Sequence, residues 1–141
     1  MWTYLTFVPC ALALIALVAL VTKSTSAGST RSPWRVAAAL WLLSWLATVV
    51  ILYGRSQGSL LHHFIGQREA GYWLGSAVML ALPFFAVAGV GKFLLSAPAA
   101  APQTTRVTLG AVALVGWLLT PGLFGVGWVT GCVILGYQAC M

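Results

Sequence analysis

The chain has 141 residues, of which 61% are hydrophobic and only 6% are charged, and its formal net charge is +6. A water-soluble domain carries about 25% charged residues, so this composition excludes a soluble globular protein and predicts one domain, residues 1–141, embedded in a lipid bilayer. The basic residues are scattered singly at the ends of apolar runs. They lack the clustered basic face that nucleic-acid binding needs, so we expect no nucleic-acid partner.

Four apolar runs are long enough to cross a hydrocarbon core, which takes about 20 helical residues. We therefore predict an all-α membrane protein with four transmembrane helices, at about residues 4–21, 34–53, 71–95 and 107–137. The first run has no positively charged segment before it, and its first basic residue, Lys23, follows it. A signal peptide has the opposite order, so we expect this run to be retained as a span.

The linkers at residues 23–35 and 96–106 are rich in Ser, Thr, Ala and Pro, and we predict both to be irregular. Ser32 followed by Pro33 is typical of a helix start. In the second span Trp34, Trp41 and Trp45 share one helical face. This face has two interpretations: ordinary packing, or a stacking surface for a planar ligand such as a quinone or porphyrin. We predict that it looks outward, onto another subunit or its bound lipid.

Residues 55–70, between the second and third spans, are too polar to cross the membrane, and their pattern favours a short amphipathic helix lying in the interface. Both histidines of the chain, His62 and His63, lie here, with Arg68 and the only acidic residue, Glu69. These four side chains are the candidate cofactor or partner contacts, together with Trp41 and Trp45.

The chemistry open to this segment is narrow. Adjacent histidines on a helix point about 100° apart, so His62 and His63 cannot hold one ion from the same face, and we assign no metal site. A haem would need a second ligand from elsewhere or from a partner. Glu69 precedes the third span, where a carboxylate stabilises the positive end of the helix dipole. The alternative is a proton-coupled carboxylate, but such groups usually lie deep within a span.

Glycine and proline mark the last two spans. Gly71 with Gly75, and Gly127 with Gly131, have the spacing that lets helices approach closely. Pro83 lies mid-span and predicts a kink. The last apolar run would measure about 46 Å as one straight helix, against a core of about 30 Å. We therefore expect this run to be kinked or broken at Pro121.

The three cysteines are neither paired as C-x-x-C nor close to a histidine in sequence, so we expect free thiols rather than a zinc site. They are Cys10, Cys132 and Cys140. Nucleophile, base and acid do not occur together in any recognisable arrangement, so we expect no catalytic activity of the chain's own.

Charge distribution predicts the orientation, because positive residues favour the cytoplasmic side. In a four-span chain the first and third linkers share a side and hold five basic residues, against two on the other side. The five are Lys23, Arg31, Arg35, Lys92 and Arg106. Both termini and the histidine segment should then face outward, into the periplasm if the membrane is a bacterial inner membrane.

The leading functional hypothesis is a non-catalytic membrane subunit that scaffolds or stabilises a larger membrane complex, with lipids and other membrane subunits as partners. One alternative is an electron-transfer subunit that holds a haem or quinone at the histidines and the face of Trp41 and Trp45. Another is a small transporter or channel component whose last span lines a cavity.

Overall fold

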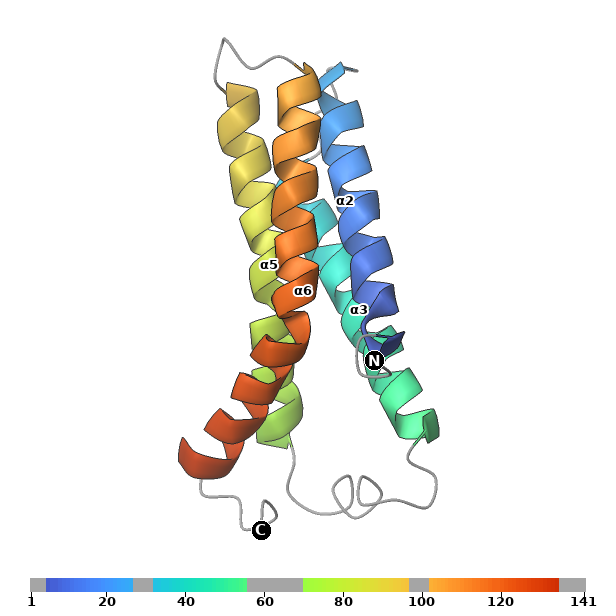
Figure 1. The fold of residues 1–141 in the computed structure, drawn as a ribbon, viewed down its shortest axis with the longest axis vertical. Coiled ribbons are helices and arrows are strands. Elements are labelled where there is room, and N and C mark those ends of the chain that lie inside the picture. Colours follow the sequence, from blue (N-terminus) through green and yellow to red (C-terminus); the bar gives the residue numbers. More distant parts are fainter. Residues whose placement is uncertain (1–4, 27–31, 56–69, 97–101, 135–141) are drawn as a thin grey trace.

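The computed structural model of the chain describes residues 5–26, 32–55, 70–96 and 102–134, and its regular elements there are all helices. The helices are α2 (Val8–Ser26), α3 (Pro33–Arg55), α5 (Ala70–Ser96) and α6 (Pro102–Ile134). Successive helices run in opposite directions along one common axis (Figure 1). The all-α fold predicted from composition is confirmed. The interfacial helix predicted at residues 55–70 lies almost entirely outside the described residues.

Three of the helices are long and apolar enough to cross a membrane, which makes the chain a membrane-embedded helical bundle. Their apolar stretches are Pro33–Ile51, Gly75–Ser96 and Gln103–Leu123, whereas the apolar stretch of α2, Val8–Lys23, is shorter. A bilayer leaves backbone groups no water to bond, so a spanning segment must satisfy them within its own helix. That α2 also crosses the membrane stays a prediction.

The two linkers predicted to be irregular are partly helical. Helix α2 continues to Ser26, beyond the predicted end at residue 21, and α6 begins at Pro102, before the predicted start at residue 107. Proline suits the first turn of a helix, where its missing N–H has no intrahelical partner to lose. Hydropathy marks where the apolar stretch stops, but polar residues can continue the same helix beyond it. The start of α3 at Pro33 agrees with the Ser32–Pro33 signal.

Helix α6 runs from Pro102 to Ile134 with Pro121 inside it. The alternative in which the last span breaks at Pro121 is therefore wrong. Proline removes one backbone hydrogen bond from a helix, and here the turns on either side continue without that bond. Pro83 is likewise inside α5. Whether either proline kinks its helix stays a prediction.

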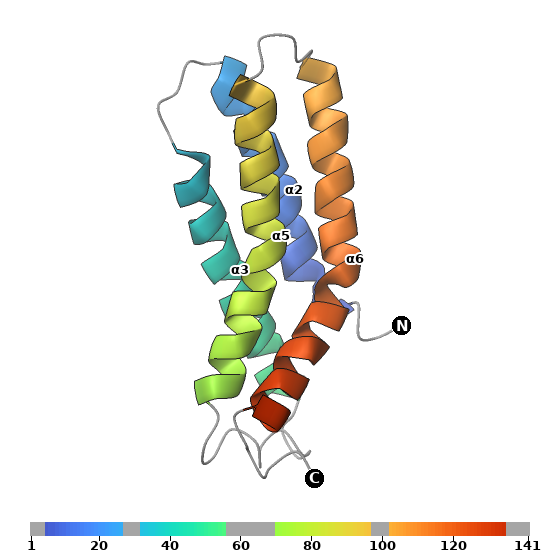
Figure 2. The same ribbon diagram turned by 90° about the vertical axis from the view of Figure 1, so that its left-hand side faces the viewer.

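The four helices form a ring in the order α2, α3, α5, α6, with the most extensive contact between α5 and α6. Helix α2 also reaches across the ring to α5, and Figures 1 and 2 together show the four rods around a shared interior. Most of the buried core side chains come from α2, α5 and α6. They include Leu14, Leu17, Leu80, Phe84, Val87 and Leu109. Among the described residues, the only fully buried hydrophobic side chain from α3 is Ala37, and the other core contacts of this helix come from partly buried residues, so α3 is the peripheral helix.

Candidate functional site

The polar segment singled out by the sequence is not described by the structure. His62, His63, Arg68 and Glu69 all lie within residues 56–69, outside the described ranges. The packing around Gly71, Gly127 and Gly131 is also outside the described side chains, and Gly75 is half-buried on α5. These predicted contacts therefore remain predictions.

The tryptophan face of α3 points toward α5, not outward. The Trp41 indole Nε1 donates a hydrogen bond of 2.8 Å to the backbone oxygen of Ala77. The Trp41 ring is tilted against Phe85 with centroids 6.3 Å apart, and the Trp34 ring is stacked on Phe85 at 6.1 Å. Trp41 and Trp45 both pack against the hydrophobic core. The predicted outward orientation of this face is wrong for Trp41 and Trp45; Trp34 is 38% exposed.

The reason lies in the small residues between the tryptophans. Ala37, Ser44 and Thr48 are buried, and with Trp41 they recur at intervals of four, three and four residues. Such a stripe forms one helical face. Small side chains on this face let α3 approach the bundle, and the indoles then fill the space beside them. Trp34 and Trp41 therefore pack at the boundary between α3 and α5.

Three of the buried hydroxyl groups bond to carbonyl oxygens of their own helices. Ser44 Oγ donates to the Trp41 carbonyl oxygen at 2.9 Å, and Thr48 Oγ1 donates to the Ser44 carbonyl oxygen at 2.8 Å. Thr120 Oγ1 donates to the Gly116 carbonyl oxygen at 2.8 Å. Back-bonding of this kind lets a short polar side chain sit in an apolar interior without a desolvation penalty. These hydroxyls are therefore explained by packing and helix geometry.

Helices α2 and α6 are joined by two polar contacts near the start of α2. Cys10 is a buried free thiol, as expected from the sequence, and its Sγ lies 3.7 Å from Thr120 Oγ1. The Trp117 indole Nε1 donates a hydrogen bond of 3.2 Å to the Phe7 backbone oxygen. The first and last helices of the bundle are therefore neighbours. The side chains of Cys132 and Cys140 are outside the description.

Among the glycines whose surroundings are described, two that the sequence did not single out lie closest to a neighbouring helix. A Cβ added at Gly116 of α6 would lie 2.7 Å from Pro83 Cβ of α5, and one added at Gly91 would lie 2.9 Å from Val21 Cγ1 of α2. Neither belongs to a G-x-x-x-G pair. The available signal was spacing: Gly116 recurs at three- and four-residue intervals with Ala113 and Thr120, which are buried.

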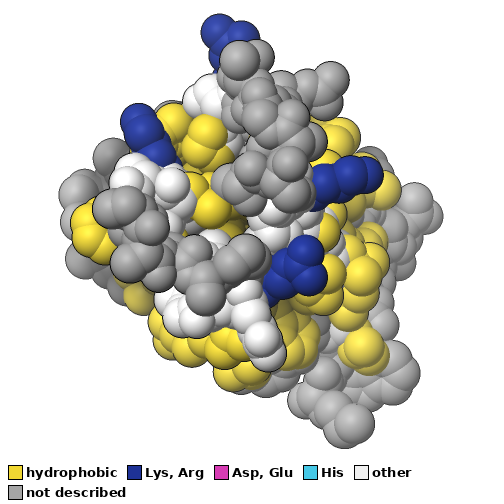
Figure 3. Space-filling view, turned by 90° about the horizontal axis from the view of Figure 1, so that it is seen from above, with side chains coloured by type: hydrophobic (Ala, Val, Ile, Leu, Met, Phe, Trp, Pro, Cys, Tyr) yellow, Lys and Arg dark blue, Asp and Glu magenta, His cyan; other side chains and the backbone are white. Residues whose placement is uncertain are grey.

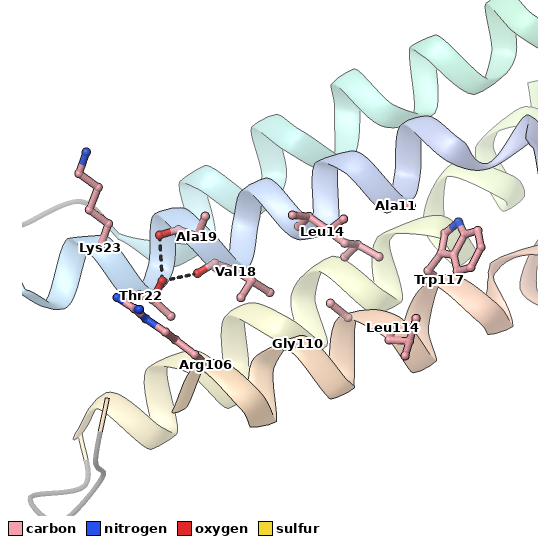
Figure 4. A pocket seen from close by; sticks show the side chains of 12 residues that line it. Ala11, Leu14, Val18, Ala19, Thr22, Lys23, Arg106, Gly110, Leu114 and Trp117 are labelled. Atoms are coloured by element: carbon pink, nitrogen blue, oxygen red, sulfur yellow. Dashed lines mark hydrogen bonds between the residues drawn. The ribbon is translucent and has the colours of Figure 1, made fainter. Parts of the chain in front are cut away.

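A groove of about 720 Å³ lies between α2 and α6 on the outside of the bundle. Its walls are mostly apolar, and its polar side chains gather at one end, where the C-terminal part of α2 meets the start of α6. Figure 4 shows these polar residues as Thr22, Lys23 and Arg106, with Trp117 toward the other end. Nothing in the sequence pattern distinguished this surface, because both walls come from apolar runs 80 residues or more apart.

Comparison with known proteins adds no family assignment: no known protein family, curated protein or solved structure matches the chain. Within the described ranges, no three His, Cys, Asp or Glu residues come close enough together to hold a metal ion. Trp45 Nε1 is buried and meets no acceptor among the described residues. The described part of the chain therefore contains helix-packing surfaces and a groove between α2 and α6, which has basic side chains at one end.

Proposed function

We propose that the protein is a non-catalytic integral membrane subunit that stabilises a larger membrane complex. The observation that carries the proposal is how the described interior is composed: mostly apolar side chains, with the hydroxyls of Ser44, Thr48 and Thr120 bonded to carbonyl oxygens of their own helices. An interior that only packs suits a structural role. An ion or substrate path would instead need polar groups directed into a cavity of the bundle.

The partner surface that we propose is the outer face of α3, replacing the tryptophan face. Helix α3 packs against α2 and α5 but barely against α6. Leu43, Leu46 and Val50 are exposed at three- and four-residue intervals, the spacing of side chains that interlock between helices. The occupant proposed for this face is an apolar transmembrane helix of another subunit.

Co-purification tests this role. The tagged full chain is isolated from its native membranes in mild detergent, and its companions are identified. The variant Leu46→Ala with Val50→Ala should lose the partner, since truncating anchors at the centre of an interface typically costs at least about 1–2 kcal/mol. The control is Leu118→Ala with Leu119→Ala, which removes two exposed leucines from α6. A wild-type chain that is a monomer without companions would contradict the proposed function.

The proposed topology has four spans, an interfacial helix between the second and third, and both termini with His62 and His63 on the outer side of a bacterial inner membrane. Its support is that the described basic side chains gather at one end of the bundle, as the view onto that end shows (Figure 3). They are Lys23, Arg35, Lys92 and Arg106. Cysteines introduced at Ser26 and Gln103 should label from the cytoplasm, and one at Gln57 from outside. Labelling of positions 26 and 57 from the same side would contradict four spans.

A bend near Pro121 also belongs to this proposal. Its support is that the C-terminal part of α6 leaves the direction of the part before it in Figure 2, in the region where Pro121 lies. Proline clashes with the carbonyl one turn earlier and commonly bends a helix. Spin-label distances measured between positions 106 and 130, in the wild type and in Pro121→Ala, should lengthen in the variant. Equal distances would contradict the bend.

A further inference from the structure

We propose that the groove between α2 and α6 binds one anionic glycerophospholipid, with its acyl chain along the groove and its phosphate against Arg106. The inference rests on the proposed topology of the membrane-embedded bundle but needs no partner subunit, so it can hold or fail separately from the proposed subunit role.

The shape of the groove suits an acyl chain. Its lining includes small residues from both helices, among them Ala11, Ala19 and Ala113, and the larger side chains of Ile15 and Leu114, which are exposed. Small residues between larger ones leave a long concavity that opens to the lipid side. A Cβ added at Gly110 would meet no atom within 4 Å, so the absence of a side chain there leaves part of this concavity open.

The length of the groove matches one leaflet of a bilayer. The lining residues of α2 extend from Ala11 to Lys23, a distance of about 18 Å at 1.5 Å per residue. Half of a hydrocarbon core measures about 15 Å. A lipid whose headgroup is level with Lys23 would thus have its chain end near Ala11 and Trp117, about where the leaflet ends.

Charge selects the headgroup. Arg106 extends from α6 toward Thr22 of α2 across the end of the groove, whereas the Lys23 side chain extends from the opposite side of α2 (Figure 4). A guanidinium group donates two parallel hydrogen bonds to phosphate oxygens. An anionic headgroup, as in phosphatidylglycerol, therefore fits this end better than a zwitterionic one.

The described ranges of the chain contain no Asp or Glu side chain. The only acidic residue of the chain is Glu69, which the proposed topology places at the opposite end of the bundle. The end with Arg106 carries the excess of positive charge that faces the cytoplasmic leaflet, where anionic lipids concentrate. Charge complementarity thus favours a lipid phosphate over other occupants.

Native mass spectrometry of the full chain in detergent tests the proposal, with phosphatidylglycerol and phosphatidylcholine of identical acyl chains. The wild type should retain phosphatidylglycerol in preference. Arg106→Gln should weaken its binding about fivefold, from the contribution of one basic residue at a membrane surface. Arg106→Lys keeps the charge and should retain most of the affinity. The matched control is Arg35→Gln, which removes an exposed cation from α3, outside the groove, and should bind as the wild type does.

A second pair of variants tests the acyl chain. Gly110→Leu fills the groove and should reduce retention of phosphatidylglycerol. Gly125→Leu adds the same side chain to α6 at another position with open space and outside the groove, and should not. Equal binding by Gly110→Leu and the wild type, or equal losses in Arg106→Gln and Arg35→Gln, would overturn the proposal.

Inorganic phosphate separates a lipid site from a simple anion site. Added phosphate should displace phosphatidylglycerol only poorly, because it has no chain to occupy the groove. Ready displacement by phosphate alone, or equal retention of phosphatidylglycerol and phosphatidylcholine, would also overturn the assignment of an anionic lipid.

Discussion

Helix α6 packs differently on its two sides, and two of its glycines show the difference. Toward α5, Gly116 lies so close to Pro83 that an added Cβ would be only 2.7 Å from the proline Cβ. Toward α2, Gly110 lines the groove, and an added Cβ would meet nothing within 4 Å. The two sites are six residues apart on one helix and hold the same residue.

The comparison teaches that glycine serves two opposite purposes in this bundle. At Gly116 the missing side chain lets two helices touch, and at Gly110 it leaves a space that helices do not fill. Both uses depend on the neighbouring helix. Gly116 faces Pro83 of α5, whereas Gly110 faces the groove between α6 and α2. Alanine substitutions separate the two, because the added methyl group has opposite consequences.

The largest effect is expected for Gly116→Ala. The new methyl group collides with the proline ring, and Pro83 Cα is also only 3.5 Å away, so the backbones of α5 and α6 must separate. Overpacking of this kind costs about 1–3 kcal/mol. The free energy of unfolding, measured by denaturant titration in mixed micelles, should fall by that amount. An unchanged value would mean that the contact between α5 and α6 is looser than this distance indicates.

A smaller loss of unfolding free energy is expected for Gly91→Ala. This variant compares a neighbouring side chain that can move with the rigid proline ring beside Gly116. The nearest atom is a methyl group of Val21, 2.9 Å from the added Cβ. A side-chain methyl can move more easily than a proline ring, so the cost should be below that of Gly116→Ala. In the same assay, Val21→Ala should remove most of the Gly91→Ala penalty, since contacting residues are not additive. Additive losses would assign the penalty to another contact.

Trp41→Phe extends the comparison to the α3–α5 boundary. The change removes the 2.8 Å hydrogen bond to the Ala77 oxygen but keeps an aromatic ring beside Phe85. Hydrogen bonds between membrane helices contribute about 0.6 kcal/mol on average, so unfolding should become easier by roughly this amount. Trp34→Phe is the control, because Trp34 is partly exposed and stacked on Phe85. A larger loss of unfolding free energy in Trp34→Phe than in Trp41→Phe would contradict the expectation that Trp41 stabilises the bundle more than Trp34.

The smallest effect, opposite in sign, is expected for Gly110→Ala. Alanine favours a helix over glycine by up to about 1 kcal/mol, and here nothing opposes the added methyl group. The free energy of unfolding should rise slightly or stay constant, measured without added anionic lipid. A loss comparable with that of Gly116→Ala would erase the distinction between the two sides of α6.

Sequence spacing located some of these contacts and missed others. The small residues Ala37, Ser44 and Thr48 have helical spacing in the sequence, but the predicted orientation of this helix rested on the tryptophans. The G-x-x-x-G spacing does not identify Gly116 or Gly91, because their close contacts are formed with residues distant in the chain. The groove had no local signal, since Lys23 and Arg106 are 83 positions apart.

The sequence by itself determined the helical class, the membrane as solvent and the approximate position of each helix. It could do so because a bilayer permits few backbone structures and a long apolar run satisfies one of them. Only the tertiary structure decided which face of α3 turns inward, which glycines touch a neighbour and where a groove remains. Lipid and protein interior are similarly apolar, so residues that face one or the other look alike until the helices are placed together.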